Sequence, residues 1–144
     1  MSAQIAVESQ AVTTTILVVE DEIFVRLDIA EVLRNASFRV IEAGNADEAL
    51  DVLNSAYPID ALMTDIRMPG SIDGIDLAAR VRSAWPNMKI IFVTSHSPTC
   101  PDPTLFDLFI GKPYDRARFI QRVRQLLARD SFWRVMMPEP PSGK

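Results

Sequence analysis

The chain has 144 residues, a formal net charge of −4 and a sequence pI of about 4.9. It is therefore long enough for one domain with a hydrophobic core, and its acidic balance argues against nucleic acid as a partner. The only cysteine, Cys100, excludes an internal disulfide and a cysteine-rich metal site. There is no basic, apolar leader and no apolar stretch of membrane-spanning length. We therefore expect a cytoplasmic protein without a membrane partner.

The N-terminal residues show no periodicity, so we expect a flexible arm at 1–13, a single domain at 14–129 and a C-terminal tail at 130–144. Short apolar runs predict five strands, at residues 16–19, 38–42, 59–65, 88–93 and 105–110. Apolar residues at helical spacing predict four helices, at residues 25–36, 46–53, 71–85 and 115–127. Asn45, followed by Glu48, and Asp115 are typical helix caps.

Strands that alternate with helices indicate an α/β protein with a parallel sheet covered on both faces. A flavodoxin-like, doubly wound sheet with the strand order 2-1-3-4-5 places strands 1 and 3 side by side at its centre. Because Glu20 and Asp21 follow strand 1 and Asp65 ends strand 3, this order would bring their carboxylates together.

Polar residues stand at or directly after four of the predicted strands: Glu20, Asp21, Asp65, Thr94 and Lys112. Three acids in one pocket repel one another, and a hard divalent cation such as Mg²⁺ would remove that cost. Thr94 and Lys112 would offer a hydroxyl and a positive charge to phosphoryl oxygens. Asp65 is the natural nucleophile, because a carboxylate can form an aspartyl phosphate.

Four stretches together resemble the receiver domain of two-component response regulators: 17–22 (LVVEDE), 63–70 (MTDIRMPG), 93–95 (VTS) and 112–114 (KPY). The resemblance covers roughly residues 14 to 129, and the strand order above is in part taken from this family. It implies that Asp65 accepts a phosphoryl group from a histidine kinase or a histidine phosphotransfer protein.

The resemblance also implies how other residues act. Asp21, Asp65 and the backbone carbonyl of Arg67 would bind Mg²⁺, with Glu20 acting mainly through a metal-bound water. Thr94 would move toward the phosphoryl group on activation, and Lys112 would pair with it. A cis peptide bond before Pro113 would aim Lys112 inward.

Three further residues have both a plain and a functional interpretation. Phe109 falls where the family keeps a switch aromatic, although an apolar core residue is also expected there. His96, the only histidine, is either a solvated loop residue or a partner of Arg67. In the second case, we hypothesise that these two basic groups shield the acyl phosphate from water and prolong its life.

The sequence departs from the family in two places. Pro98, Pro101 and Pro103 occupy the segment of the family's fourth helix, so we expect that helix to be shortened or absent. Receivers commonly dimerise through the face that includes this helix, so a homodimer here would use another face or the tail. The apolar tail residues either pack on the domain's own surface or contact a partner: Phe132, Trp133, Val135, Met136 and Met137.

We therefore expect a single-domain response regulator, not an enzyme, that signals to an unknown downstream protein by a phosphorylation-driven switch. One alternative is a phosphate-independent interaction module or a phosphate sink. Another is a small phosphatase with Asp65 as nucleophile, although Arg67 stands where such a mechanism would want a second acid. A nucleotide- or flavin-binding protein is less well supported, because no glycine-rich loop follows the first strand.

Overall fold

The computed structural model describes residues 13–95 and 101–136, with side chains described as far as residue 128. A single parallel sheet forms the middle layer, in the order β2-β1-β3-β4-β5. Its strands are β1 (Thr15–Val19), β2 (Arg39–Ala43), β3 (Ala61–Thr64), β4 (Lys89–Thr94) and β5 (Leu108–Gly111). The predicted flavodoxin-like fold and strand order are confirmed.

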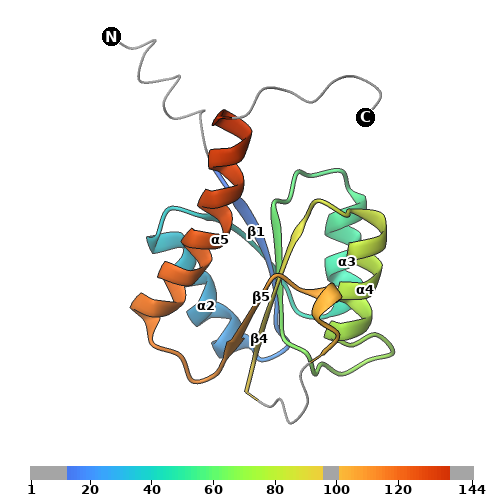
Figure 1. Ribbon diagram of the computed structural model, residues 1–144. Coiled ribbons are helices and arrows are strands. Elements are labelled where there is room, and N and C mark those ends of the chain that lie inside the picture. Colours follow the sequence, from blue (N-terminus) through green and yellow to red (C-terminus); the bar gives the residue numbers. More distant parts are fainter. Residues whose placement is uncertain (1–12, 96–100, 137–144) are drawn as a thin grey trace, which may run out of the picture.

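Helices cover both faces of the sheet (Figure 1). They are α2 (Ile23–Asn35) and α5 (Arg116–Met136) on one face, and α3 (Ala46–Asn54) and α4 (Gly74–Ala84) on the other. Successive residues of a strand point to opposite faces. Within β1, Ile16 and Val18 therefore enter the core under α2 and α5, whereas Leu17 and Val19 enter the core under α3 and α4. This two-sided burial explains why the strands are almost wholly apolar.

Short polar side chains fix where three helices begin. The Asn45 side chain accepts a hydrogen bond from Glu48 N at 2.8 Å, and that of Asp115 accepts one from Arg118 N at 2.9 Å, so both predicted caps are confirmed. Asp73 and Asp76 form a reciprocal capping box at the start of α4. The expected start of this helix at Ser71 is therefore three residues too early.

The segment before β5 differs from a regular helix, as the prolines indicated. Among the described residues between β4 and β5, only Pro103–Leu105 are helical, as a single 3-10 turn, η1. Asp102 caps this turn by accepting a hydrogen bond from Thr104 N at 2.9 Å. The strand therefore begins at Leu108, later than the predicted Leu105.

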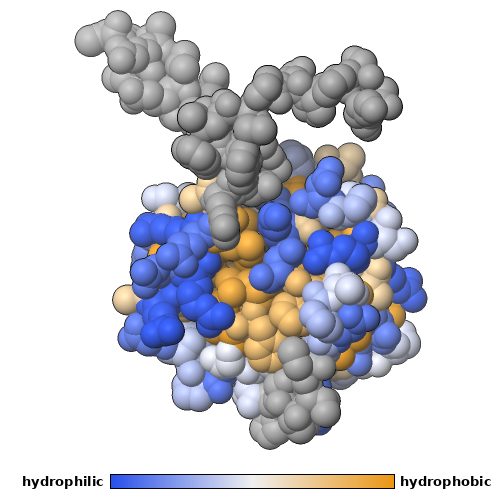
Figure 2. Space-filling view, viewed as in Figure 1, coloured by the Kyte–Doolittle hydropathy of each residue, from blue (hydrophilic) through white to orange (hydrophobic). Residues whose placement is uncertain are grey.

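Arg82 of α4 braces the described part of this segment. Its guanidinium donates to the carbonyls of Thr104 and Met88 and pairs with Asp107 at 3.0 Å. The same Asp107 oxygen accepts a hydrogen bond from Ile90 N at 2.9 Å, so the brace reaches β4. Figure 2 shows hydrophobic residues at the surface in the region of β5, between hydrophilic neighbours.

Strand β5 forms one edge of the sheet, and α5 packs beside it. Arg122 of α5 donates to the carbonyl oxygen of Phe109 at 3.0 Å, so a backbone acceptor of this edge strand is engaged by a side chain. Helix α5 continues to Met136, past the expected boundary at residue 129. The side chains of the apolar tail residues lie outside the described part of the chain. In the part that is described, no helix is long and apolar enough to cross a membrane.

Candidate functional site

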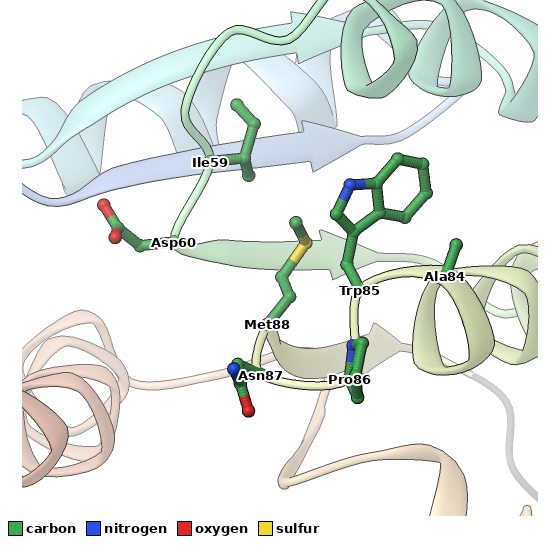
Figure 3. Close-up of a pocket in the computed structure, with 7 residues that line it drawn as sticks. All are labelled: Ile59, Asp60, Ala84, Trp85, Pro86, Asn87 and Met88. Carbon is green, nitrogen blue, oxygen red and sulfur yellow. The ribbon is translucent and has the colours of Figure 1, made fainter. Parts of the chain in front are cut away.

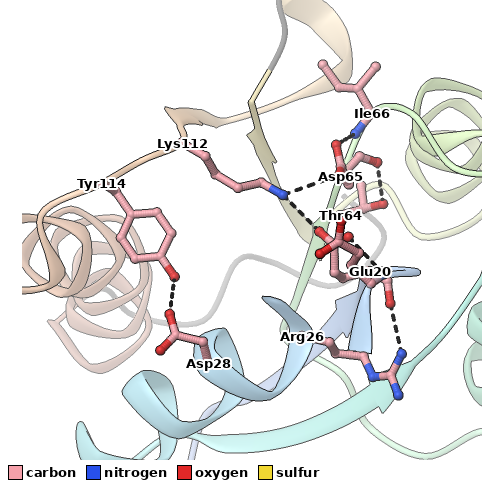
Figure 4. Close-up of polar contacts among 9 residues, drawn as sticks. Glu20, Arg26, Asp28, Thr64, Asp65, Ile66, Lys112 and Tyr114 are labelled. Carbon is pink, nitrogen blue, oxygen red and sulfur yellow. Dashed lines mark hydrogen bonds and ion pairs between the residues drawn. The ribbon is translucent and has the colours of Figure 1, made fainter. Parts of the chain in front are cut away.

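Polar side chains from three strands converge where those strands end. Glu20 follows β1, Asp65 follows β3 and Lys112 follows β5. The Lys112 ammonium lies 3.0 Å from a carboxylate oxygen of Glu20 and 3.3 Å from one of Asp65 (Figure 4). Lys112 is 92 positions from Glu20 and 47 positions from Asp65 in the sequence, yet its ammonium group contacts both carboxylates.

Three acids of this site could hold a metal ion. Glu20, Asp21 and Asp65 each offer a carboxylate oxygen, and these oxygens lie within 4.8 Å of one another. Glu20 is only 3% exposed, Asp65 is partly buried and Asp21 is open to solvent. An all-oxygen set of this size, with one side open for waters, fits Mg²⁺.

Burial and charge shape the protonation of this cluster. Burial raises the pKa of Glu20 above its ordinary value, although the hydrogen bond from Lys112 works against that rise. For Lys112, burial alone would lower the pKa. The hydrogen bond to Glu20 and the negative charge of Asp65 outweigh it and raise the pKa, so the ammonium stays protonated at neutral pH. Lys112 therefore compensates part of the acidic charge.

Local hydrogen bonds orient the carboxylates of Glu20 and Asp65. The second carboxylate oxygen of Glu20 accepts a bond from Glu22 N at 3.2 Å. Asp65 accepts one from Ile66 N at 2.7 Å through its other oxygen, and the Thr64 hydroxyl donates to the Asp65 carbonyl at 2.8 Å. Each carboxylate is thus held on both oxygens before any ligand arrives.

Gly74 is a residue of the site to which the sequence reasoning gave no role. A Cβ atom at this position would lie 1.8 Å from the carbonyl oxygen of Asp65 and 2.9 Å from Cα of Ile66. Its own N–H donates to the Ile66 carbonyl at 2.8 Å. Only glycine lets α4 begin this close to the backbone of Asp65. The Asp73-Gly74 pair in the sequence was the available signal.

The structure describes three of the four remaining predicted residues, Thr94, Phe109 and Arg67. Thr94 ends β4 and is buried, and the peptide bond before Pro113 is cis, as predicted. Phe109 is partly buried, and its ring packs 6.4 Å from that of Phe92 and 5.8 Å from that of Phe106. Arg67 is exposed on the loop after Asp65. The proposed partner of Arg67, His96, lies outside the described residues.

A second polar contact ties α2 to the loop that carries Lys112. The Tyr114 hydroxyl donates to Asp28 at 3.2 Å (Figure 4). Arg116 pairs with the other oxygen of the same carboxylate. Burial, followed by the charge of Asp28, raises the pKa of Tyr114 to about 12. The tyrosine ring also stacks on Phe119, with a centroid separation of 4.6 Å. The sequence offered no signal for this contact, since its partners are 86 residues apart.

A pocket of about 460 Å³ opens between α2 and this loop, and Lys112 and Tyr114 line it. Phe24, which lines it too, is 81% exposed, and its neighbours Ile23 and Leu27 are 52% and 46% exposed. A single exposed apolar side chain is common, but several neighbouring ones are typical of a surface that a partner covers. The surface formed by Ile23, Phe24 and Leu27 is called the α2 patch below.

A different pocket lies at the opposite end of the sheet (Figure 3). It has a volume of about 310 Å³ and lies between the residues that precede β3 and β4, lined by Ile59, Asp60, Ala84, Trp85, Pro86, Asn87 and Met88. Of the predicted site residues that the structure describes, none lines it. The acidic cluster and this pocket are therefore separate features at opposite ends of the strands.

Comparison with known proteins agrees with this geometry. The family model for the response regulator receiver domain matches residues 16–124, and the chain therefore belongs to this family. Receiver domains are in general signalling modules of two-component systems, and not enzymes.

The chain is also similar to individual proteins of two-component systems and phosphorelays. The response regulator protein TrrA from Thermotoga maritima, solved in complex with Mg(2+)-BeF, is 30% identical with a TM-score of 0.73, over 79% of this chain and 99% of that chain. Sporulation initiation phosphotransferase F from Bacillus subtilis is 30% identical over 56% of this chain and 64% of its own length. Sensor kinase CckA from Brucella abortus is 28% identical over 81% of this chain but only 13% of its own length. The chain thus spans less than two thirds of the length of these two curated relatives.

Proposed function

We propose that this chain accepts a phosphoryl group on Asp65 from a histidine kinase or a histidine phosphotransfer protein, with Mg²⁺ bound, and signals through a change of conformation. The main support for the proposal is the position of the Lys112 ammonium, 3.0 Å from a carboxylate oxygen of Glu20 and 3.3 Å from one of Asp65. These two acids, together with Asp21, could hold a cation. The structure of TrrA with Mg(2+)-BeF supports the same assignment by similarity.

In the proposed reaction, a carboxylate oxygen of Asp65 attacks the phosphorus atom of a phosphohistidine. A new O–P bond forms as the N–P bond breaks, and the electron pair of that bond returns to the imidazole nitrogen of the donor. Lys112 stabilises the negative charge on the phosphoryl oxygens during this transfer. Bound Mg²⁺ would supply further neutralisation, with Glu20, Asp21, Asp65 and the Arg67 carbonyl as its ligands or near neighbours.

The conformational response would begin at the neighbouring strand ends. Thr94 is buried at the end of β4 and would donate its hydroxyl to the new phosphoryl group. Phe109 lies in the adjacent strand, inside the cluster of aromatic rings, and its repacking would carry the change to the surface. Arg67 and His96 would set the lifetime of the acyl phosphate, as hypothesised from the sequence.

The α2 patch is the proposed landing surface for the phosphodonor protein. A donor histidine must reach Asp65, and Phe24 lines the same pocket as Lys112, which is hydrogen-bonded to Asp65. Burying three exposed apolar side chains would favour docking at this place. A small phosphodonor such as acetyl phosphate needs no such contact, so the two kinds of donor can be separated experimentally.

Labelling with acetyl phosphate and Mg²⁺ tests the central assignment. Intact mass should show one added phosphoryl group on the wild type and none on Asp65→Asn. Asp51→Asn is the matched control, because Asp51 is exposed on α3, away from the site, and it should be labelled like the wild type. An unlabelled wild type would contradict phosphoryl acceptance, and equal labelling of Asp65→Asn would contradict the choice of acceptor.

A further inference from the structure

Arg26 lies behind the acidic cluster and contacts it through the backbone. It belongs to the first turns of α2, and its side chain is only 18% exposed. Its Nη1 donates to the carbonyl oxygen of Glu20 at 2.9 Å (Figure 4). Its Nε donates to a carboxylate oxygen of Glu42 at 3.2 Å. One planar guanidinium thus joins the end of β1 to strand β2.

The surroundings of Arg26 restrict where its guanidinium can lie. Arg34, two turns further along α2, holds the other oxygen of Glu42 at 3.1 Å, so Glu42 cannot swing away freely. A Cβ atom at Gly44 would lie 3.3 Å from Nη1 of Arg26, closer than ordinary van der Waals contact. The absence of a side chain at Gly44 therefore leaves the space that the guanidinium fills.

The contact with Arg26 completes the fixation of Glu20. The Glu20 N–H donates to the Ala43 carbonyl at 3.1 Å, and its carboxylate is held by Lys112 and by the Glu22 N–H. Arg26 donates a hydrogen bond to the Glu20 carbonyl, which belongs to the peptide bond between Glu20 and Asp21. The orientation of Asp21, which is exposed, therefore depends on the peptide that Arg26 holds.

We infer that Arg26 is a positioning residue that holds the Glu20–Asp21 backbone in the geometry that binds a divalent cation. The inference rests on the proposed function, because it concerns the metal site of that function. Side chains that orient metal ligands typically change metal affinity by about 10- to 100-fold when they are removed.

The sign of the effect separates positioning from simple electrostatics. Removing a positive charge beside a cation site lowers the repulsion of the incoming ion, so Coulomb's law alone predicts tighter binding of Mg²⁺ by Arg26→Gln. Loss of positioning predicts weaker binding. The two explanations therefore differ in direction and not only in size.

The test is calorimetric titration of the full, unphosphorylated chain with MgCl₂ alone, together with its thermal unfolding midpoint in the absence of Mg²⁺. We expect Arg26→Gln to bind Mg²⁺ about tenfold more weakly than the wild type. Arg124→Gln is the matched control: it loses the same charge and an exposed contact with the Ala36 carbonyl, but it leaves Arg26 and both of its acceptors unchanged. Its Mg²⁺ affinity should equal that of the wild type.

Equal or tighter binding of Mg²⁺ by Arg26→Gln would overturn the inference while leaving the proposed function intact. A wild type that does not bind Mg²⁺ would instead contradict the proposed function. Should Arg26→Gln fail to fold, Arg26→Lys takes its place, because it keeps the charge but reaches only one of the two acceptors at a time. A smaller loss of affinity is then expected, and an unchanged affinity would overturn the inference.

Discussion

Lys112 shows how a single side chain makes an acidic site compatible with folding. Two carboxylates at the ends of different strands would repel each other, and each would lose hydration on burial. The ammonium group lies within 3.3 Å of both and donates a hydrogen bond to each. The same position would place it against phosphoryl oxygens. The ammonium group that offsets the repulsion between the carboxylates in the unphosphorylated site is therefore also suited to stabilise a phosphoryl group on Asp65.

Tyr114 gives a prediction about pH. Because burial and the Asp28 carboxylate raise its pKa to about 12, this phenol should remain protonated well after an ordinary tyrosine has ionised. The folded state then binds the proton more tightly than the unfolded state, so the contribution of Tyr114 to stability falls as pH rises from about 10 towards 12.

Ultraviolet titration of the native protein measures this directly, since the chain has only two tyrosines. The titration of Tyr114 is the difference between the signals of the wild type and Tyr114→Phe, and its midpoint should lie near pH 12. In Asp28→Asn, which lacks the carboxylate, the midpoint of Tyr114 should be lower. Circular dichroism at each pH confirms that the fold persists. A midpoint near 10 for Tyr114 in the folded wild type would contradict the burial and the contact.

At the scale of elements, the start of α4 fixes the loop that carries Asp65. The capping box of Asp73 and Asp76 sets the first turn, and Gly74 lets that turn touch the Asp65 backbone. The apolar stripe had indicated that the helix begins at Ser71. This contact explains why it begins at Gly74 instead. A stripe reports which residues are buried, whereas the boundary is set by a cap and by a close approach between two backbones.

Gly74→Ala should therefore displace α4 from Asp65. A Cβ atom cannot remain 1.8 Å from a carbonyl oxygen, so the helix or the loop must move, at a cost of about 1–3 kcal/mol in the free energy of unfolding. Phosphorylation by acetyl phosphate should slow as well, because the nucleophile moves with its backbone.

Gly111→Ala is the matched control for this substitution. A Cβ atom there meets nothing within 4 Å, so both stability and phosphorylation should stay close to those of the wild type. Urea unfolding and the rate of mass labelling are the two measurements. Unchanged values in Gly74→Ala would show that the close approach has no effect on the site.

For the whole molecule, the layers could be predicted from the sequence because burial leaves a periodic trace, whereas the strand order came in part from the resemblance to receiver domains. The runs at β1 and β4 are apolar on both faces, and the described residues between β4 and β5 contain only a single 3-10 turn, as the proline cluster indicated. The expected start of β5 at Leu105 was wrong, because Leu105 is apolar yet ends a 3-10 turn capped by Asp102. A short apolar run does not distinguish these two conformations.

The site could be predicted only where its residues stand at strand ends. Glu20, Asp65 and Lys112 are such residues, and the topology of a parallel sheet brings them together. Arg26, Gly74 and the pair of Asp28 with Tyr114 were missed, because their roles arise from contacts between elements distant in sequence or from the absence of a side chain. Apart from the Asp73-Gly74 pair, no local pattern in the sequence indicated these contacts.

The α2 patch leads to a prediction for the assembled signalling pair. Phe24→Ser should slow phosphoryl transfer from a phosphorylated histidine phosphotransfer protein about tenfold, because truncation of an aromatic side chain central to an interface commonly costs 1–2 kcal/mol or more. Labelling by acetyl phosphate should be unchanged, since that donor does not need the patch. Tyr57→Ser, at an exposed apolar position before β3, serves as control. Equal slowing with both donors would mean that Phe24 acts on the site itself and not on docking.

The hydrogen bond from Arg122 to the Phe109 carbonyl bears on behaviour at high concentration. Strand β5 is an open margin of the sheet, and an unprotected margin can recruit strands from other molecules and so nucleate fibres. Here a charged guanidinium occupies one of the acceptors that a recruited strand would need. An invading backbone would have to expel that charge first, so this contact from α5 would oppose the pairing of β5 with a strand of another molecule.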